Sequence, residues 1–227
     1  MKNYKFEEIQ KKISENNLLR PVDVLLVGGT GVGKSSTLNA LFGTEVAKVG
    51  YGVEPETKIV SDYSLNDYFR IHDSAGLGDG KSSDIEHSKN IISALLKPVT
   101  GKDKPYGFID IALVLLDGGS RDLGTTFHLL ETVILKNITP DRVIVAINQA
   151  DMAMKGRYWD TQRSQPQPEL YQFLEDKANS VVSRLKEATG LNIAKPVYYS
   201  AVHRYNIEAL MDHIIRHFPT GRRLLTQ

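Results

Sequence analysis

A glycine-rich loop between an apolar run and a helix constrains this chain more than any other feature of its sequence. Residues 28–35 read Gly-Gly-Thr-Gly-Val-Gly-Lys-Ser and match the pattern GxxxxGK[ST] in full. The apolar run Val22–Val27 predicts a strand before the loop, and Lys34–Phe42 predicts a helix after it, capped by Gly43. A glycine turn with a solvated lysine would not need this strand–loop–helix context. The pattern therefore predicts a phosphate-binding loop.

Each residue type in the loop has a chemical reason to be there. Glycines let successive backbone N–H groups turn inward around phosphate oxygens, and the start of the following helix adds partial positive charge. Lys34 can reach the β and γ phosphates of a nucleotide, and the Ser35 hydroxyl can ligate Mg2+. We expect the phosphates to contact Gly28, Gly29, Thr30, Gly31, Val32, Gly33, Lys34, Ser35 and Ser36.

Three weaker signals follow the loop in chain order, each at the end of an expected strand. Asp73-Ser74-Ala75-Gly76 is a DxxG sequence, in which the aspartate can hold Mg2+ through water and the glycine N–H can sense the γ phosphate. Asn148-Gln149-Ala150-Asp151 can select guanine, because its aspartate accepts hydrogen bonds from N1–H and the exocyclic amine while its asparagine braces the loop. Ser200-Ala201 can offer a backbone N–H to guanine O6. Open α/β sheets bind ligands at the carboxyl ends of their strands, so we expect these segments to meet.

Expected strands alternate with expected helices along the chain. This order implies right-handed crossovers and an α/β fold of three layers, with a mostly parallel six-stranded sheet and helices on both faces. The near-continuous apolar run Phe108–Leu116 lacks alternation, which indicates a strand buried on both faces. Further strands are expected at 58–63, 68–72, 142–147 and 196–200, further helices at 84–96, 123–136, 168–188 and 207–217, and loops at 44–57, 76–83 and 97–107.

The length and the N-terminal pattern suggest a simple domain organisation. A chain of 227 residues is long enough for one sizeable domain, so we expect a nucleotide-binding domain over residues 21–227 behind a helical extension over residues 1–20. In that extension Phe6, Ile9, Ile13 and Leu18 recur at roughly helical spacing among charges. Packing against its own domain is the favoured interpretation of this helix, and contact with a membrane surface or a partner is the alternative.

The composition excludes several classes of function. The chain has no cysteine, which removes disulfides, thiolate metal sites and thiol chemistry. A formal net charge of +1 argues against a dominant nucleic-acid footprint. The longest apolar run, Ile111–Leu116, is far shorter than the ~20 residues that cross a bilayer, and the N-terminus lacks the apolar core of a secretory signal. We therefore expect a soluble, cytoplasmic protein.

Together these motifs resemble the translation-factor-related small GTPases, with Era-like proteins the nearest branch and the bacterial YfjP-like GTPases the most similar group within it. The similarity covers residues 22–218 and implies the P-loop NTPase fold, with GTP or GDP as ligand and Mg2+ as cofactor. It assigns a switch threonine to Thr57, preferred over Thr44 because Thr57 directly precedes a strand. The resemblance implies catalytic roles for Lys34, Thr57 and Gly76, Mg2+ contacts from Ser35, Thr57 and Asp73, and base contacts from Asn148, Asp151, Ser200 and Ala201.

Three positions depart from the pattern of this family. Gln149 replaces the usual lysine, whose stem covers the purine ring, so nucleotide affinity is expected to be lower. Leu77 stands where Ras-like proteins place the glutamine that orients the attacking water, so hydrolysis is expected to be slow without help from a switch residue, a second subunit or a partner. Gly31 replaces the asparagine of potassium-activated relatives, so no strong potassium stimulation is expected.

More than one function is compatible with these residues. The leading hypothesis is a Mg2+-dependent GTPase switch, and the second is a GTP-gated binding or dimerisation module with negligible turnover. An ATP-dependent kinase would need a catalytic base and a substrate pocket, for which the sequence has no signature. A homodimer or protein partner through the switch loops, the ribosome and RNA are all compatible partners, because the fold does not identify the regulated process.

A few charged or metal-ligating residues have a less specific interpretation. His213 and His217 stand four apart on an expected helix and could face a zinc ion, but no third ligand is evident. His203 is a modest candidate for a contact near the base. Arg121 is expected to form an exposed ion pair rather than to act as an arginine finger. The Arg222–Arg223 pair is expected to keep the chain terminus soluble.

Overall fold

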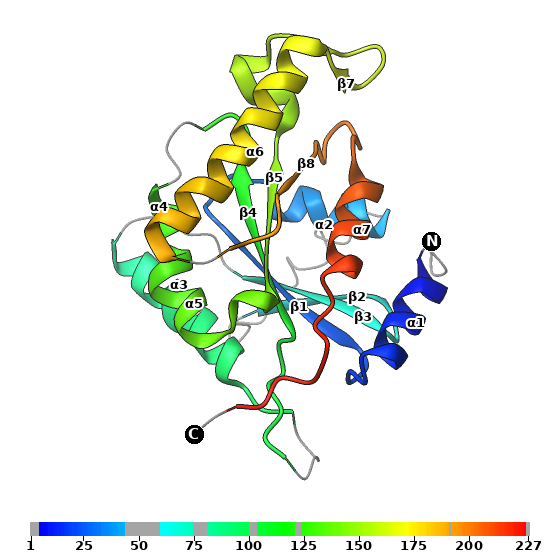
Figure 1. The fold of residues 1–227 in the computed structure, drawn as a ribbon, viewed down its shortest axis with the longest axis vertical. Coiled ribbons are helices and arrows are strands. Elements are labelled where there is room, and N and C mark those ends of the chain that lie inside the picture. The colour runs from blue at the N-terminus through cyan, green and yellow to red at the C-terminus, as the bar shows by residue number, and fades with distance from the viewer. Residues whose placement is uncertain are drawn as a thin grey trace, which may run out of the picture.

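A six-stranded sheet forms the centre of the computed structural model, which describes residues 5–43, 60–74, 81–99, 104–120, 124–190 and 192–225 (Figure 1). The strand order is β2-β3-β1-β4-β5-β8. β2 is antiparallel to β3, and all other neighbours are parallel, so the predicted mostly parallel six-stranded sheet is confirmed. The strands are β1 (Val22–Gly28), β2 (Val60–Asn66), β3 (Phe69–Ser74), β4 (Ile111–Asp117), β5 (Val143–Asn148) and β8 (Val197–Tyr198).

The central strands are buried almost throughout, because helices cover both faces of the sheet. Every residue of β1 and β5 is buried, as the lack of alternation in such apolar runs predicts. The parallel register sets Leu26 beside Asp73 and Asp117 beside Asn148. The ends of β3, β1, β4 and β5 are thereby brought to the same edge of the sheet, where their loops can share a ligand.

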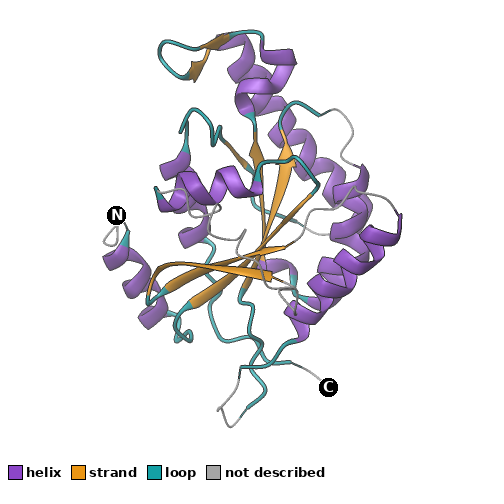
Figure 2. Ribbon diagram, turned by 180° about the vertical axis from the view of Figure 1, so that it is seen from behind, coloured by secondary structure: helices purple, strands orange, loops and turns teal. Residues whose placement is uncertain are grey.

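Helices lie on both sides of the sheet (Figure 2), and two hydrophobic clusters, one on each face, hold the three layers together. The three-layer α/β fold expected from the sequence is therefore confirmed. One face carries α1 (Phe6–Glu15), α2 (Lys34–Phe42) and α7 (Ile207–Arg216). The other carries α3 (Lys81–Leu96), α4 (Gly124–Leu129), the π-helical turn Leu130–Ile134, α5 (Leu135–Asn137) and α6 (Pro168–Thr189).

The segment between β5 and α6 contains structure that was not expected from the sequence. It holds a 3-10 segment, η4 (Ala150–Gly156), and a small hairpin of β6 (Trp159–Asp160) and β7 (Gln165–Pro166), drawn at the top of Figure 1. Two-residue strands are too short to show a periodic pattern. A second 3-10 turn, η3 (Pro140–Arg142), precedes β5.

The N-terminal helix α1 contributes to the core of the domain. Ile9 is fully buried and Ile13 nearly so, in the cluster that also contains residues of α2 and α7. Lys5 Nζ lies 2.6 Å from Asp212 Oδ1, and the Asn16 side-chain amide donates to Pro219 O at 2.9 Å. The extension expected over residues 1–20 is thus joined to the domain through its apolar face.

The interpretation of the Arg222–Arg223 pair as solubilising is wrong for Arg223, of which only 7% is exposed. Its guanidinium donates to Ile109 O at 2.9 Å, to Asn137 O at 3.3 Å and to Leu95 O. The chain terminus folds back against residues 105–109, with Gly107 N–H donating to Arg223 O. A basic pair near a terminus gives no sequence signal of such a long-range contact.

Replacing Arg223 with alanine is expected to lower the free energy of unfolding by about 2–4 kcal/mol, because two buried carbonyls and one partly buried carbonyl lose their donor. Urea denaturation of both proteins measures this loss. Arg222→Ala is the matched control, since that side chain donates to Asn17 O at an exposed position. Its expected loss is below about 1 kcal/mol, and equal losses in the two variants would contradict the role assigned to Arg223.

Asp110 is a buried carboxyl group at the start of β4 whose ionisation is expected to make stability depend on pH. Asp23 N–H donates to its Oδ2 at 3.1 Å. Burial raises the pKa of Asp110 from its ordinary 3.8 to about 7; the Asp23 N–H bond and the charges of Arg142 and Arg223 act in the opposite direction, while the Asp23 carboxylate adds to the rise. Between these two pH values the unfolded chain binds fewer protons than the folded protein. The free energy of unfolding therefore falls as pH rises from about 4 to 7.

Asp110→Asn removes this titration. The free energy of unfolding of the variant, relative to that of the wild type, is therefore expected to increase as pH rises. The difference in unfolding free energy between the two proteins should shift in favour of the variant by up to about 4 kcal/mol between pH 4 and pH 7.5. Urea denaturation at several pH values measures the shift. A difference that stays constant with pH would show that Asp110 does not titrate in this range.

Candidate functional site

The loop from Gly28 to Lys34 has three glycines that no other residue can replace without strain: Gly28, Gly33 and Gly31, which has a φ of 78°. A Cβ on Gly28 would lie 2.9 Å from Val32 Cγ1 and 3.0 Å from Leu115 O. Gly33 has a φ of 88°, and a Cβ there would lie 2.4 Å from Asn148 Nδ2. The loop therefore curls tightly between β1 and α2 because glycine supplies both the backbone conformation and the space.

Lys34 lies at the start of α2 with its side chain folded over this loop. Its Nζ donates to Gly28 O at 3.1 Å and to Gly29 O at 3.3 Å. Ser35 and Ser36 are exposed in the first turn of the same helix. The loop thus presents an ammonium group, two hydroxyls and a helix N-terminus together, which is a set of groups suited to phosphate oxygens.

Tyr199, a buried residue directly after β8, supports the phosphate loop. This role was not predicted from the sequence. Thr37 Oγ1 donates to Gly33 O at 2.8 Å and lies 2.7 Å from Tyr199 OH. Tyr199 is fully buried, and its burial raises the pKa of the phenol, so the hydroxyl stays neutral. This contact ties the phosphate loop to the segment that follows β8.

Asn148 joins the two halves of the site through one side-chain amide. Its Nδ2 donates to Val32 O at 2.9 Å, and its Oδ1 accepts from Ala201 N–H at 3.1 Å. The residue ends β5 and is 2% exposed. Next to it, Gln149 has a φ of 59° and donates from Nε2 to Gly31 O at 2.7 Å. Both residues therefore contact the phosphate loop directly.

One carboxylate oxygen of Asp73, near the end of β3, accepts no hydrogen bond within the described part of the chain. This oxygen, Oδ1, is buried. Burial raises the pKa of Asp73 from 3.8 to about 6, against the opposing charge of Lys34. Together with the Ser35 hydroxyl this orphaned oxygen fits Mg2+, which takes oxygen ligands and is usually held by one or two carboxylates plus substrate phosphates.

The described residues contain no cluster of side chains that suggests a zinc site. They contain no group of three or more histidine and acidic side chains that could hold an ion. His213 is buried, and burial followed by the charges of His217 and Arg216 lowers its pKa to about 4. Its ring packs edge-on against that of His217 at 4.5 Å, so this pair has a packing role.

The base-selecting residues expected from the sequence lie next to one another. The Asp151 side chain is 11% exposed, and His203 Nε2 lies 3.9 Å from its Oδ2. Ser200 is buried and accepts from His203 N–H at 3.2 Å. The Ala201 N–H, considered above for guanine O6, donates to Asn148 instead. Within the described residues the next N–H, that of Val202, makes no hydrogen bond.

Several sequence-predicted residues lie outside the described part of the chain. These are the two candidate switch threonines, Thr57 and Thr44, the second-switch residues Gly76 and Leu77, and Arg121.

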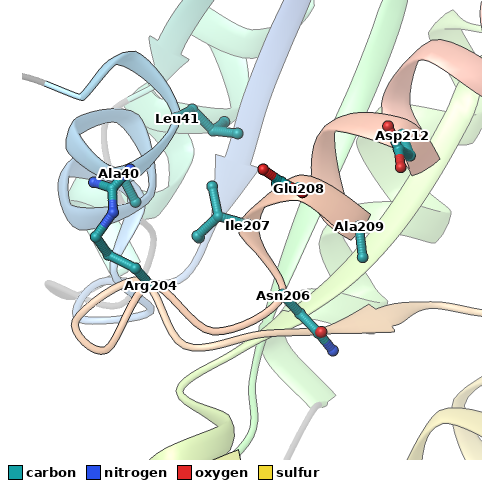
Figure 3. A pocket seen from close by; sticks show the side chains of 8 residues that line it. All are labelled: Ala40, Leu41, Arg204, Asn206, Ile207, Glu208, Ala209 and Asp212. Atoms are coloured by element: carbon teal, nitrogen blue, oxygen red, sulfur yellow. The ribbon is translucent and has the colours of Figure 1, made fainter. Parts of the chain in front are cut away.

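A cavity of about 730 Å3 lies between α2 and α7, beside the loop that follows β8 (Figure 3). The Arg204 side chain extends in it toward Ala40 of α2. Glu208 and Asp212 bring negative charge to its other wall, which is unfavourable for a phosphate group. The cavity is therefore not part of the phosphate site.

Lys177 of α6 holds the loop after β4 in place, a role that sequence reasoning also missed. Its Nζ donates to Asp117 O at 2.9 Å, Gly118 O at 2.7 Å and Ser120 O at 2.7 Å. Burial lowers the pKa of Lys177, while the Asp117 charge raises it. Gly118 N–H in turn donates to Asn148 O at 2.7 Å. The available signal was the position of this lysine on the buried stripe of α6, whose members are Leu170, Leu174, Ala178, Val181 and Leu185.

The phosphate loop, the oxygen donors for Mg2+ and the linked base loop define a nucleotide-binding α/β protein. The family model described as 50S ribosome-binding GTPase matches residues 23–149, which is more than half of the chain. The chain therefore belongs to this GTPase family, and the P-loop GTPase assignment made from the sequence is confirmed. No curated protein matches the chain in sequence.

Solved structures with the same fold share little sequence with this chain. Toc33 from Arabidopsis thaliana in complex with GDP and Mg2+ has a TM-score of 0.64 at 16% identity, covering 98% of this chain and 94% of that one. Era from Aquifex aeolicus bound to GDP.AlF4- has a TM-score of 0.54 at 17% identity. That match covers 92% of this chain but only 60% of Era. A probable GTP-binding protein engB has a TM-score of 0.52 at 18% identity, covering 87% and 98%.

The described helices do not include a membrane-spanning segment. None of them combines the length and the apolar character that a bilayer crossing requires.

Proposed function

We propose that this protein is a GTP-binding switch of the Era-like, YfjP-like group that hydrolyses GTP slowly with Mg2+. The observation that carries the proposal is the Asn148 side chain, which bonds Val32 O of the phosphate loop and Ala201 N–H of the base loop. A single amide that links these two loops couples phosphate binding to base recognition. A generic phosphate site would not need that link.

The groups at the phosphate end act mainly by electrostatic positioning. Loop N–H groups and Lys34 neutralise the β and γ phosphates, and Thr57 and Gly76 are the proposed γ-phosphate sensors. Ser35, Asp73 and Thr57 would hold Mg2+, which would supply positive charge to stabilise the negative charge that develops on the phosphates. The charge of Lys34 favours the ionised form of the Asp73 carboxyl group by lowering its pKa, against the larger effect of burial.

At the base end the Asp151 carboxylate is the proposed acceptor for guanine N1–H and the exocyclic amine. We assign guanine O6 to the N–H of Val202, because the Ala201 N–H already donates to Asn148. The Ser200 hydroxyl supports this turn through His203 N–H. Gln149 lies beside the purine with its amide fixed to Gly31 O, so it covers the ring without adding a charge.

The proposed turnover is slow for a reason that lies in the sequence. Leu77 follows Gly76, and an apolar side chain cannot polarise the attacking water. Gly31 offers no side chain to a monovalent cation, so replacing potassium with sodium should leave the rate of phosphate release unchanged. A fall in that rate would overturn this part of the proposal.

Competition among GTP, GDP and ATP for the wild-type protein tests the central claim. Both guanine nucleotides should bind at least about 100-fold more tightly than ATP, because adenine leaves the buried Asp151 carboxylate without its donors. Removing Mg2+ should weaken GTP binding. Equal competition by ATP would mean that the guanine assignment is wrong.

A second function, a GTP-gated dimerisation module with negligible intrinsic turnover, is favoured by Leu77. In the chloroplast translocon components atToc33 and psToc159, which share this fold at a TM-score of 0.64 and 16% identity, dimerization is important for GTPase activity. Single-turnover hydrolysis at increasing protein concentration separates the two functions. A rate that rises with concentration supports assistance by a second copy, and a constant measurable rate supports the switch acting alone.

The composition of the chain bears on where the protein acts. A sequence without cysteine suits the reducing cytoplasm, which we propose as the location. One Era structure contains a segment of 16S ribosomal RNA, and this chain covers 60% of that Era chain. With a net charge of +1 the chain has no overall attraction to RNA, so a protein partner at the switch loops is the proposed effector.

A further inference from the structure

The tight turn after β8 holds His203 in a defined position. Ser200 and Tyr205 exchange two backbone hydrogen bonds, at 3.1 and 3.0 Å, and His203 N–H donates to Ser200 Oγ. Arg204 and Asn206 have φ values of 54° and 55°, a left-handed conformation that side chains other than glycine adopt uncommonly. Strain of this kind is typical of functional sites, where the surrounding contacts maintain it.

The His203 imidazole lies between a carboxylate and an indole. Its Nε2 is 3.9 Å from Asp151 Oδ2, and its ring centroid is 5.1 Å from that of Trp159. Trp159 also packs edge-on against Tyr205, at 5.6 Å. Its indole N–H makes no hydrogen bond within the described residues, so packing against these rings and against the neighbouring hydrophobic cluster sets the orientation of Trp159. Both aromatic residues lie beyond residues 23–149, the part of the chain that the family model matches.

In the described part of the chain, His203 is the only basic side chain within 4 Å of the Asp151 carboxylate. A separation of 3.9 Å is too long for a direct hydrogen bond, so neither carboxylate oxygen accepts a hydrogen bond from His203. A ring held at this distance can therefore direct the carboxylate while both oxygens stay available to a ligand. The neighbouring Arg204 side chain extends into the cavity beside α2, toward Ala40 (Figure 3).

We propose that His203, backed by Trp159, is a positioning residue that orients the Asp151 carboxylate toward the 2-amino group of guanine. This inference rests on the proposed guanine-nucleotide function of the same site. A carboxylate must place both oxygens in the plane of the base to accept from N1–H and the 2-amino group together. His203 restricts its rotation about the side chain, and Trp159 restricts the movement of His203. The hairpin of β6 and β7 thereby contributes to base selection without touching the base.

Inosine diphosphate measures this contact, because hypoxanthine keeps N1–H and O6 and lacks only the 2-amino group. The dissociation constants of GDP and IDP are measured for the wild type, His203→Ala, His203→Gln and the same-loop control Arg204→Ala. The wild type and Arg204→Ala should prefer GDP over IDP by the same factor. His203→Ala should lose about tenfold in GDP affinity and little in IDP affinity, so that the preference narrows. His203→Gln fills part of the space that the imidazole occupies beside the carboxylate and should restore part of the preference.

The possible outcomes distinguish failure of the positioning role from failure of the proposed guanine-nucleotide function. A His203→Ala variant that keeps the wild-type ratio of GDP to IDP affinities overturns the positioning role, as does equal weakening toward both nucleotides, which indicates general loss of structure. Tighter GDP binding by this variant would instead make His203 a competitor for the carboxylate and would also overturn it. A wild-type protein that binds no GDP overturns the proposed function, and this inference falls with it.

The wild-type protein offers an independent readout that needs no variant. Trp159 is the single tryptophan of the chain and packs on the His203 ring. Saturation with GDP should change its fluorescence, and IDP should change it less. An emission spectrum that GDP leaves unchanged at saturation would contradict a link between the base, His203 and Trp159.

Discussion

Replacing Lys34 with alanine is expected to weaken GTP binding by about 100-fold or more. Two effects combine in this variant. The ammonium group that would face the β and γ phosphates is removed, and the loop loses the hydrogen bonds from Nζ to Gly28 O and Gly29 O. The loss should be larger for GTP than for GDP, because only GTP has the γ phosphate. Titration of both nucleotides with the wild type and the variant gives the two ratios.

A control lysine and one further readout distinguish this effect from unfolding. Lys89→Ala removes an exposed lysine of α3 and should leave GTP affinity unchanged. In Lys34→Ala the pKa of Asp73 should rise further, because the Lys34 charge now lowers it. Affinity for GTP within about threefold of the wild type would mean that the phosphates bind elsewhere.

The phosphate loop was the most predictable part of the molecule because its signal is local. The glycines, Lys34 and Ser35 occupy eight consecutive positions, and the strand and helix on either side continue the same signal. The six strands of the sheet were also expected, since buried parallel strands leave long apolar runs such as β4. For Asn148, its place after such a run was enough to expect a brace for the loop.

The supports of the site could not be predicted because their partners are distant in the chain. Thr37 and Tyr199 are 162 residues apart, and Lys177 reaches carbonyls 57 to 60 residues away. Tyr199 has an ordinary local interpretation as a core tyrosine, and the place of Lys177 on the buried stripe of α6 gives no indication of which carbonyls it contacts. Arg223 was misjudged for the same reason, since its three acceptors lie on segments 86 to 128 residues earlier.

The base end of the site was partly predictable from the sequence, less than the phosphate loop and more than the distant supports. The sequence Asn148-Gln149-Ala150-Asp151 predicted a base-reading carboxylate, but nothing local linked it to Trp159 or His203. The hairpin that carries Trp159 is made of two-residue strands, and His203 was only a modest candidate for a contact near the base. The structure brings both to Asp151, so base selection is expected to involve more of the chain than the motif itself.

Asp151→Asn is expected to exchange one base preference for another. Asparagine at this position turns one carboxylate oxygen into an N–H donor, which would face the N–H donors of guanine. GDP affinity should fall by about 100- to 1000-fold. Xanthine carries a carbonyl where guanine carries the 2-amino group, so the new amide can donate to it. Affinity for xanthosine diphosphate should rise by a comparable factor, measured by titration of both nucleotides.

The gain of a ligand makes this variant more informative than a simple loss. A misfolded protein loses GDP, but it cannot acquire tight binding of a different base. Asp141→Asn, which alters an exposed aspartate away from the site, should leave both affinities unchanged. If Asp151→Asn keeps its preference for GDP, the carboxylate does not read the base. The roles of His203 and Trp159 would then have to be assigned to folding, because they reach the base only through Asp151.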